Sequence, residues 1–194
     1  MRIGVYCGSF NPVHKGHIKI VRECLEQSLV DVVFIIPTGN YWYKTDLMDI
    51  KLRTTMLRYY EDRNIRVADQ YSEYQYTYQI FEALERDYPH DEKILLLGAD
   101  NLQKFDEWAE YQYLLKFEFI IIKRDDLDKE YVEERMKQLG KENYQILNIP
   151  NIDISSTYIR ENLDDYDKIK DLIDLHVYRF LITERMKNDT TSNN

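Results

Sequence analysis

The sequence has few cysteines and no long hydrophobic runs. Its two cysteines, Cys7 and Cys24, are too few for the disulfide framework that stabilises small secreted domains. No stretch of about 18 consecutive apolar residues is present, so we expect no membrane-spanning helix. The first residues lack the apolar segment and cleavage site of a secretory signal peptide, and we therefore expect a cytoplasmic protein.

Positive charge is also scarce overall. The 194 residues include 26 Lys and Arg against 35 Asp and Glu, which gives a formal net charge of −9. Non-specific nucleic-acid binding needs a broad basic surface, so this composition argues against it. Acidic residues are nevertheless absent from residues 1–22, which contain Arg2, Lys15, Lys19, Arg22 and two histidines. This local excess of basic side chains indicates a site for a small anion.

Short apolar runs alternate with segments of helical periodicity along the chain. The expected strands are the runs at 3–7, 30–36, 65–68, 94–97, 117–123 and 145–149. The expected helices lie at 15–28, 49–60, 76–88, 129–139, 157–163 and 167–186. Strands without polar alternation are typical of a parallel sheet that is covered on both faces. The pattern therefore predicts a doubly wound, Rossmann-like α/β fold.

The predicted fold places four loops at one edge of the sheet. Residues 1–187 show no domain boundary and are assigned to a single domain, with 188–194 as a flexible polar tail. In a doubly wound sheet, ligands bind beyond the carboxyl ends of the strands. We therefore expect a common crevice at the loops that follow Cys7, Ile36, Leu97 and Ile149.

The first of these loops carries a dense set of phosphate-binding features. From Gly8 to His17 it reads G-S-F-N-P-V-H-K-G-H. Gly8 and Ser9 allow a phosphate to approach the backbone, and the following helix start offers free N–H groups and a positive dipole end. His14 and His17 are three residues apart and would share one face of that helix start. Such converging donors can stabilise the charge of a polyphosphate transition state.

Other interpretations of this loop are weaker. The dinucleotide fingerprint G-x-G-x-x-G and the P-loop pattern G-x-x-x-x-G-K-[ST] are both absent. The two histidines could instead bind zinc, although H-x-x-H alone is a weak metal motif, or they could only pack the loop. We predict no protein-bound metal site.

A second set of phosphate-type donors lies near the end of the chain. The segment from Ile154 to Arg160 reads I-S-S-T-Y-I-R. Ser155 or Ser156 can cap the helix expected from Thr157, and Arg160 lies one turn further on. A planar guanidinium suits bidentate phosphate binding, whereas a capped helix with a solvated arginine is the structural alternative.

Both segments resemble motifs of the nucleotidylyltransferase superfamily. Residues 8–17 are similar to its G-x-F-D/N-P-x-H-x-G-H signature, and residues 154–160 to its I-S-S/A-T-x-I-R motif. The resemblance implies that His14, His17 and Arg160 are catalytic and contact the phosphates of ATP, with Mg²⁺ held largely by ATP itself and no covalent enzyme intermediate. The further ATP contacts that it implies are Gly8, Ser9, Phe10, Gly16, Ser155 and Ser156.

The middle of the chain resembles the nicotinate mononucleotide adenylyltransferase family. Gly98-Ala99-Asp100-Asn101 is similar to its G-A-D-N/M segment, Tyr76-Thr77 to part of its S-Y-T stretch, and Trp108 to a tryptophan that stacks on the pyridine ring. The segment 44–57 follows its pattern of Lys, then Arg, then Met-Leu. The acceptor contacts implied by this resemblance are Lys44, Thr77, Asp100 and Trp108. The structural alternatives are a surface lysine, a helix cap for Asp100 and a packing role for Trp108.

Three departures from the family pattern fall around the expected acceptor pocket. Tyr41-Trp42-Tyr43 stands where Pro-Pro-His is common, Gln75 where serine is usual, and Ala109 where an aromatic residue often follows the tryptophan. The resemblance implies transfer of AMP from ATP to nicotinate mononucleotide by direct in-line attack, which gives deamido-NAD and pyrophosphate in NAD biosynthesis. The alternatives are another acceptor, such as nicotinamide mononucleotide or phosphopantetheine, and a non-catalytic nucleotide sensor. The sequence leaves open whether the chain forms a homo-oligomer.

Overall fold

The protein is built on a parallel β-sheet. The computed structural model describes residues 1–39, 47–123, 129–149 and 154–191, the last four of these by their backbone alone. In this part of the chain the strands form one six-stranded sheet in the order β3-β2-β1-β4-β5-β6, with every pair parallel. The strands are β1 (Arg2–Gly8), β2 (Val32–Pro37), β3 (Ile65–Val67), β4 (Glu92–Gly98), β5 (Glu118–Lys123) and β6 (Tyr144–Asn148).

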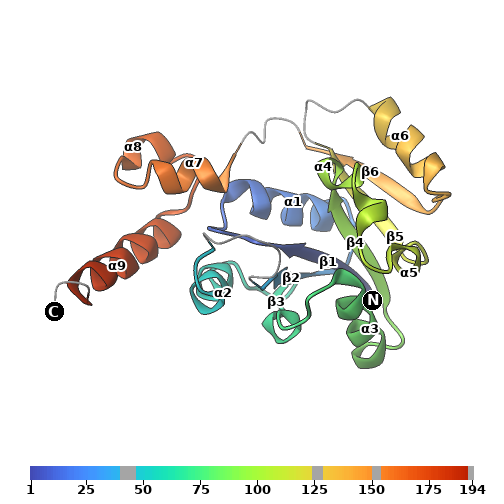
Figure 1. The fold of residues 1–194 in the computed structure, drawn as a ribbon, viewed down its shortest axis with the longest axis horizontal. Helices are drawn as coiled ribbons and strands as arrows, with labels where there is room; N and C mark the ends of the chain where they lie inside the picture. Colours follow the sequence, from blue (N-terminus) through green and yellow to red (C-terminus); the bar gives the residue numbers. More distant parts are fainter. Residues whose placement is uncertain (40–46, 124–128, 150–153, 192–194) are drawn as a thin grey trace.

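Helices cover both faces of this sheet (Figure 1). Successive residues of β2 belong to different core clusters: Val33 and Ile35 pack with one set of helices, and Phe34 and Ile36 with the other. Burial on both faces explains the unbroken apolar runs and confirms the predicted doubly wound α/β fold. The helices of the first cluster are α1 (Lys15–Glu26), α2 (Ile50–Arg58), α7 (Ser156–Glu161), α8 (Tyr166–Ile169) and α9 (Leu175–Thr191). Those of the second are α3 (Thr77–Asp87), α4 (Ala99–Leu102), α5 (Tyr111–Leu114) and α6 (Lys129–Gln138), accompanied by the 3₁₀ turns η1 (Asp69–Tyr71) and η2 (Phe105–Glu107).

The single closing helix predicted at 167–186 is wrong. The structure divides it into α8 and α9, which lie beyond one end of α1 (Figure 1). At this break the Leu172 carbonyl accepts a hydrogen bond from the Lys15 backbone N–H at 2.9 Å. The backbone of α9 continues to Thr191, and the assignment of 188–194 to a tail and of 1–187 to one domain stays a prediction. No helix in the described ranges is long and apolar enough to cross a membrane.

Candidate active site

A cavity of about 650 Å³ opens where β1 and β4 end. This is where the strand order reverses, because β1 lies between β2, which follows it in sequence, and β4. Doubly wound sheets bind ligands at such a switch point. The volume lies in the range of cavities that hold small-molecule ligands.

Residues predicted to bind ATP and residues predicted to bind the acceptor both line this cavity. The loop after β1 supplies Gly8, Ser9 and Phe10, and the first turn of α1 supplies His17. Thr77, Asp100 and Trp108 line it from the helices and turns that follow β3 and β4. The structure therefore unites a phosphate-type loop with most of the residues assigned to acceptor binding. Lys44 and the Tyr41-Trp42-Tyr43 segment lie outside the described residues.

The two histidines of the first loop are stacked on each other. Their ring centroids are 3.7 Å apart, and the ring planes differ by 24°. His17 lines the cavity, whereas His14 is only 2% exposed. The Nδ1 atom of His17 accepts a hydrogen bond from the His14 backbone N–H at 3.3 Å. A neutral His17 therefore has its proton on Nε2, where it can be donated to a ligand.

Phe10 supports His17 from the side. Its ring makes an edge contact with the His17 ring at a centroid distance of 5.0 Å, and with Tyr6 at 5.3 Å. Phe10 has a left-handed backbone with φ of 45°, an unusual conformation for a residue with a side chain. The ring also packs on Gly8, where an added Cβ would lie 2.9 Å from it. The absence of a side chain at Gly8 thus makes room for the Phe10 ring and also leaves the backbone accessible to a phosphate.

Gly8→Ala tests this packing. We expect the new methyl group to displace the Phe10 ring, destabilise the fold by about 1–3 kcal/mol and lower catalytic turnover. The stability loss follows from overpacking, and the turnover loss from the contact between Phe10 and His17. Chemical denaturation and steady-state assays measure the two effects. A variant with wild-type stability and turnover would contradict the packing argument.

The late loop joins the first loop from the other end of the chain. Ser155 caps α7 by accepting a hydrogen bond from the Thr157 backbone N–H at 3.2 Å. The Ser156 hydroxyl donates to the Pro12 carbonyl at 3.0 Å. The Arg160 guanidinium donates to the Asn11 carbonyl through Nη1 at 2.5 Å. None of these three side chains lines the cavity, but α7 is bonded directly to the loop that leads to the histidines.

The expectation of free N–H groups at the start of α1 is partly wrong. The Lys15 N–H is taken by the Leu172 carbonyl, because the break between α8 and α9 brings that carbonyl to the helix end. The His17 N–H donates to the His14 carbonyl at 3.0 Å. Gly16, a predicted ATP contact, is buried in the same turn and does not line the cavity. Phosphate binding at this site therefore relies more on side-chain donors, and less on backbone N–H groups, than the sequence suggests.

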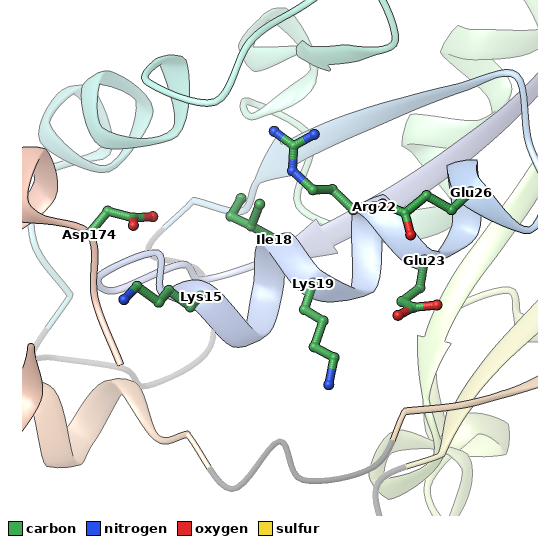
Figure 2. A pocket seen from close by; sticks show the side chains of 7 residues that line it. All are labelled: Lys15, Ile18, Lys19, Arg22, Glu23, Glu26 and Asp174. Atoms are coloured by element: carbon green, nitrogen blue, oxygen red, sulfur yellow. The ribbon is translucent and has the colours of Figure 1, made fainter. Parts of the chain in front are cut away.

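The lysines and the arginine of α1 do not line this cavity. Figure 2 shows them around a separate hollow of about 280 Å³, with Lys19 and Arg22 extending to opposite sides of the helix. Three carboxylates accompany the three cations there, so the hollow has mixed charge. It is lined by Lys15, Ile18, Lys19, Arg22, Glu23, Glu26 and Asp174.

On the acceptor side, binding and structural roles coincide. Trp108 is half-buried and packs against Phe105 at a centroid distance of 5.3 Å, while part of it lines the cavity. The Asp100 carboxylate folds back over Gly98, so that a Cβ on Gly98 would overlap Asp100 Oδ1. Both residues are placed to meet a ligand, and Trp108 is also held by its contact with Phe105.

Two buried polar residues had no role assigned from the sequence. Asn11 is 3% exposed; its Oδ1 accepts from the Met48 N–H at 3.1 Å, and its carbonyl accepts from Arg160. Arg53 is fully buried and donates to the carbonyls of Ser9 and Thr38, two residues that line the cavity. The signals available were the position of Asn11 inside the first motif and of Arg53 within the segment that follows the family pattern.

Comparison with known proteins places the chain in a family. Residues 5–162 match the model of the cytidylyltransferase-like family, and the chain belongs to that family. It is 27% identical over 190 residues to a probable nicotinate-nucleotide adenylyltransferase of Clostridium tetani, covering 91% of this chain and 94% of the relative. The corresponding protein of Carboxydothermus hydrogenoformans is 29% identical over 196 residues, with 95% and 97% covered.

Solved structures agree on the fold. The nicotinic acid mononucleotide adenylyltransferase of Plasmodium falciparum, complexed with NaAD, superposes with a TM-score of 0.80 at 20% identity and covers 96% of this chain and 97% of its own. A putative nicotinate-nucleotide adenylyltransferase from Vibrio parahaemolyticus has a TM-score of 0.63 at 21% identity, with 94% and 93% covered. The shared architecture thus extends over nearly the whole chain.

Proposed function

We propose that this protein is a nicotinate-nucleotide adenylyltransferase, which transfers AMP from ATP to nicotinate mononucleotide and releases pyrophosphate. The observation that carries the proposal is the shared cavity, in which His17 and its loop face Thr77, Asp100 and Trp108. The names of the Clostridium tetani and Carboxydothermus hydrogenoformans relatives support nicotinate mononucleotide as the acceptor. Its product, deamido-NAD, belongs to NAD biosynthesis.

The reaction needs positioning more than covalent chemistry. An oxygen of the acceptor phosphate attacks the α-phosphorus of ATP, the bond to the bridging oxygen breaks, and pyrophosphate leaves with that oxygen. His17 donates its Nε2 proton in a hydrogen bond to the phosphates, where negative charge builds up in the transition state. His14 lies behind it and holds the ring by stacking and through its backbone N–H. Holding two anionic reactants in line supplies much of the rate enhancement.

The late loop serves the leaving group in this proposal. Arg160, with Ser155 and Ser156 nearby, binds the β- and γ-phosphates as pyrophosphate departs. In the structure its guanidinium is bonded to the Asn11 carbonyl and to Thr157 Oγ1, the latter at 3.2 Å. Phosphate binding therefore requires the side chain to exchange at least part of these contacts for phosphate oxygens.

The acceptor half and the metal complete the proposal. Trp108 stacks on the pyridine ring, Thr77 and Asp100 contact the nicotinate nucleotide, and Lys44 binds its phosphate. Mg²⁺ bound to ATP would supply neutralisation of phosphate charge. The cavity also offers the carboxylates of Asp100 and Glu107, which suit an ion that takes one or two protein carboxylates beside phosphate oxygens. A cytoplasmic location stays a prediction from the sequence.

An acceptor panel tests the proposal. The purified protein is supplied with ATP, Mg²⁺ and, in turn, nicotinate mononucleotide, nicotinamide mononucleotide or phosphopantetheine. We expect the highest kcat/KM with nicotinate mononucleotide, together with one pyrophosphate for each deamido-NAD formed. A preference for another acceptor would reassign the substrate. Tight ATP binding without pyrophosphate release from any acceptor would identify a nucleotide sensor instead.

A further inference from the structure

Arg53 is a buried side chain that binds three separate segments of the backbone. It lies on α2, and none of its surface is exposed. Its Nη1 donates to the Ser9 carbonyl at 2.7 Å and to the Thr38 carbonyl at 2.8 Å, and its Nε donates to the Met48 carbonyl at 2.9 Å. One planar group thus fixes the relative positions of three carbonyl oxygens.

Two of these carbonyls belong to residues that line the cavity. Ser9 follows β1 and Thr38 follows β2, and both residues line the cavity. The Thr38 N–H also donates to the Gly8 carbonyl at 2.8 Å, so the two loops are tied to each other as well as to Arg53. Through Met48, whose N–H donates to Asn11 Oδ1, the same network reaches the residue that binds Arg160.

Burying a guanidinium costs free energy unless its N–H donors are hydrogen-bonded. Loss of any of the three carbonyl contacts of Arg53 would therefore be unfavourable, which keeps the carbonyls in place. Burial lowers the pKa of Arg53, whereas the charge of Asp49 opposes that change. Lysine has a single flexible ammonium group and cannot reproduce a planar fork that donates to three carbonyls in fixed directions. The site therefore demands arginine for its shape and not for its charge alone.

We propose that Arg53 is a positioning residue for adenylyl transfer, which sets the spacing between the loops that follow β1 and β2. The test of this role by enzyme activity rests on the proposed function. Phe10 directly follows Ser9 and His17 lies eight residues beyond it, so a shift of this loop moves the phosphate donors relative to the acceptor side of the cavity. A misplacement of about 1 Å can cost about 10²-fold in rate.

The test compares Arg53→Lys with a control that is destabilised elsewhere. Met136→Ala removes a fully buried side chain from α6, on the far side of the sheet from Arg53. Both variants are assayed well below their melting temperatures with ATP and the best acceptor. We expect kcat to fall about 10²-fold in Arg53→Lys. It should stay within about twofold of wild type in Met136→Ala, because Met136 does not line the cavity and belongs to the other core cluster from α2. If Arg53→Lys does not fold, Arg53→Gln replaces it, with two donors and no charge.

Amide hydrogen exchange provides a second readout that does not depend on activity. In Arg53→Lys, peptides covering residues 8–11 and 38–39 should exchange faster than in wild type, whereas Met136→Ala should change exchange only around α6. A wild-type protein that makes no dinucleotide would overturn the proposed function, and the exchange comparison would still decide whether Arg53 holds the loops. Unchanged loop exchange, or a kcat in Arg53→Lys no lower than in Met136→Ala, would overturn the role of Arg53.

Discussion

Replacing His17 with alanine should lower the turnover number for adenylyl transfer by about 10²–10³-fold, the scale of losing one preplaced donor to a transition state. The structure gives the reason. His17 lines the cavity, and its Nδ1 is held by the His14 backbone N–H, which leaves Nε2 as the donor. Steady-state kinetics at saturating ATP and acceptor measure the effect.

A matched control separates this loss from a general effect of removing an imidazole. His90 is exposed in the turn before β4 and does not line the cavity, so His90→Ala should retain wild-type turnover. Circular dichroism and thermal melting check that His17→Ala is folded. Turnover of folded His17→Ala within a few-fold of wild type would remove His17 from the mechanism.

Arg160→Ala should lower kcat/KM for ATP by about 10²–10³-fold, because two charge-assisted hydrogen bonds to phosphate are lost. Weaker inhibition by pyrophosphate should accompany this loss if Arg160 binds the leaving group. Arg160→Lys should recover only part of the activity, since an ammonium lacks the planar fork. Initial-rate kinetics with varied ATP, and product inhibition by pyrophosphate, give both quantities.

The contact with Asn11 offers a competing explanation that the same data distinguish. If Arg160 only anchors the first loop, kcat falls while the KM for ATP and the inhibition by pyrophosphate stay unchanged. Arg179→Ala is a suitable control, because Arg179 is exposed on α9 and does not line the cavity. Its kinetics should match those of wild type.

The parallel sheet, and the succession of strands and helices along the chain, were predictable because burial on both faces leaves a local signal in the sequence. The error at 167–186 arose from the same kind of signal. Ile169, Ile173, Val177 and Leu181 keep a four-residue spacing across the break and are all buried. Hydrophobic periodicity therefore continued where the helix did not. The Leu172 carbonyl at the break accepts its hydrogen bond from Lys15, which is distant in sequence and leaves no local signal there.

The residues that line the cavity could be predicted only where they belong to a recognisable sequence motif. Gly8, Ser9, Phe10 and His17 line the cavity as the first motif suggests, and Trp108 lines it from a short turn that periodicity did not predict. That His14 is nearly inaccessible, and that the Lys15 N–H is already bonded, depends on which distant segments pack against the loop. Such long-range packing has no local signature.

The bonds from α7 to the first loop have a consequence for how the protein folds. Arg160 and Asn11 are 149 residues apart in sequence, and Ser156 and Pro12 are 144 apart. Closing so long a loop carries an entropic cost, which slows the formation of such contacts. Strands β1 to β5 end at Lys123 and can pair before α7 has been made, but the anchoring of the histidine loop must wait until the ribosome has released most of the chain. During synthesis, the enzyme would therefore acquire its architecture before its catalytic competence.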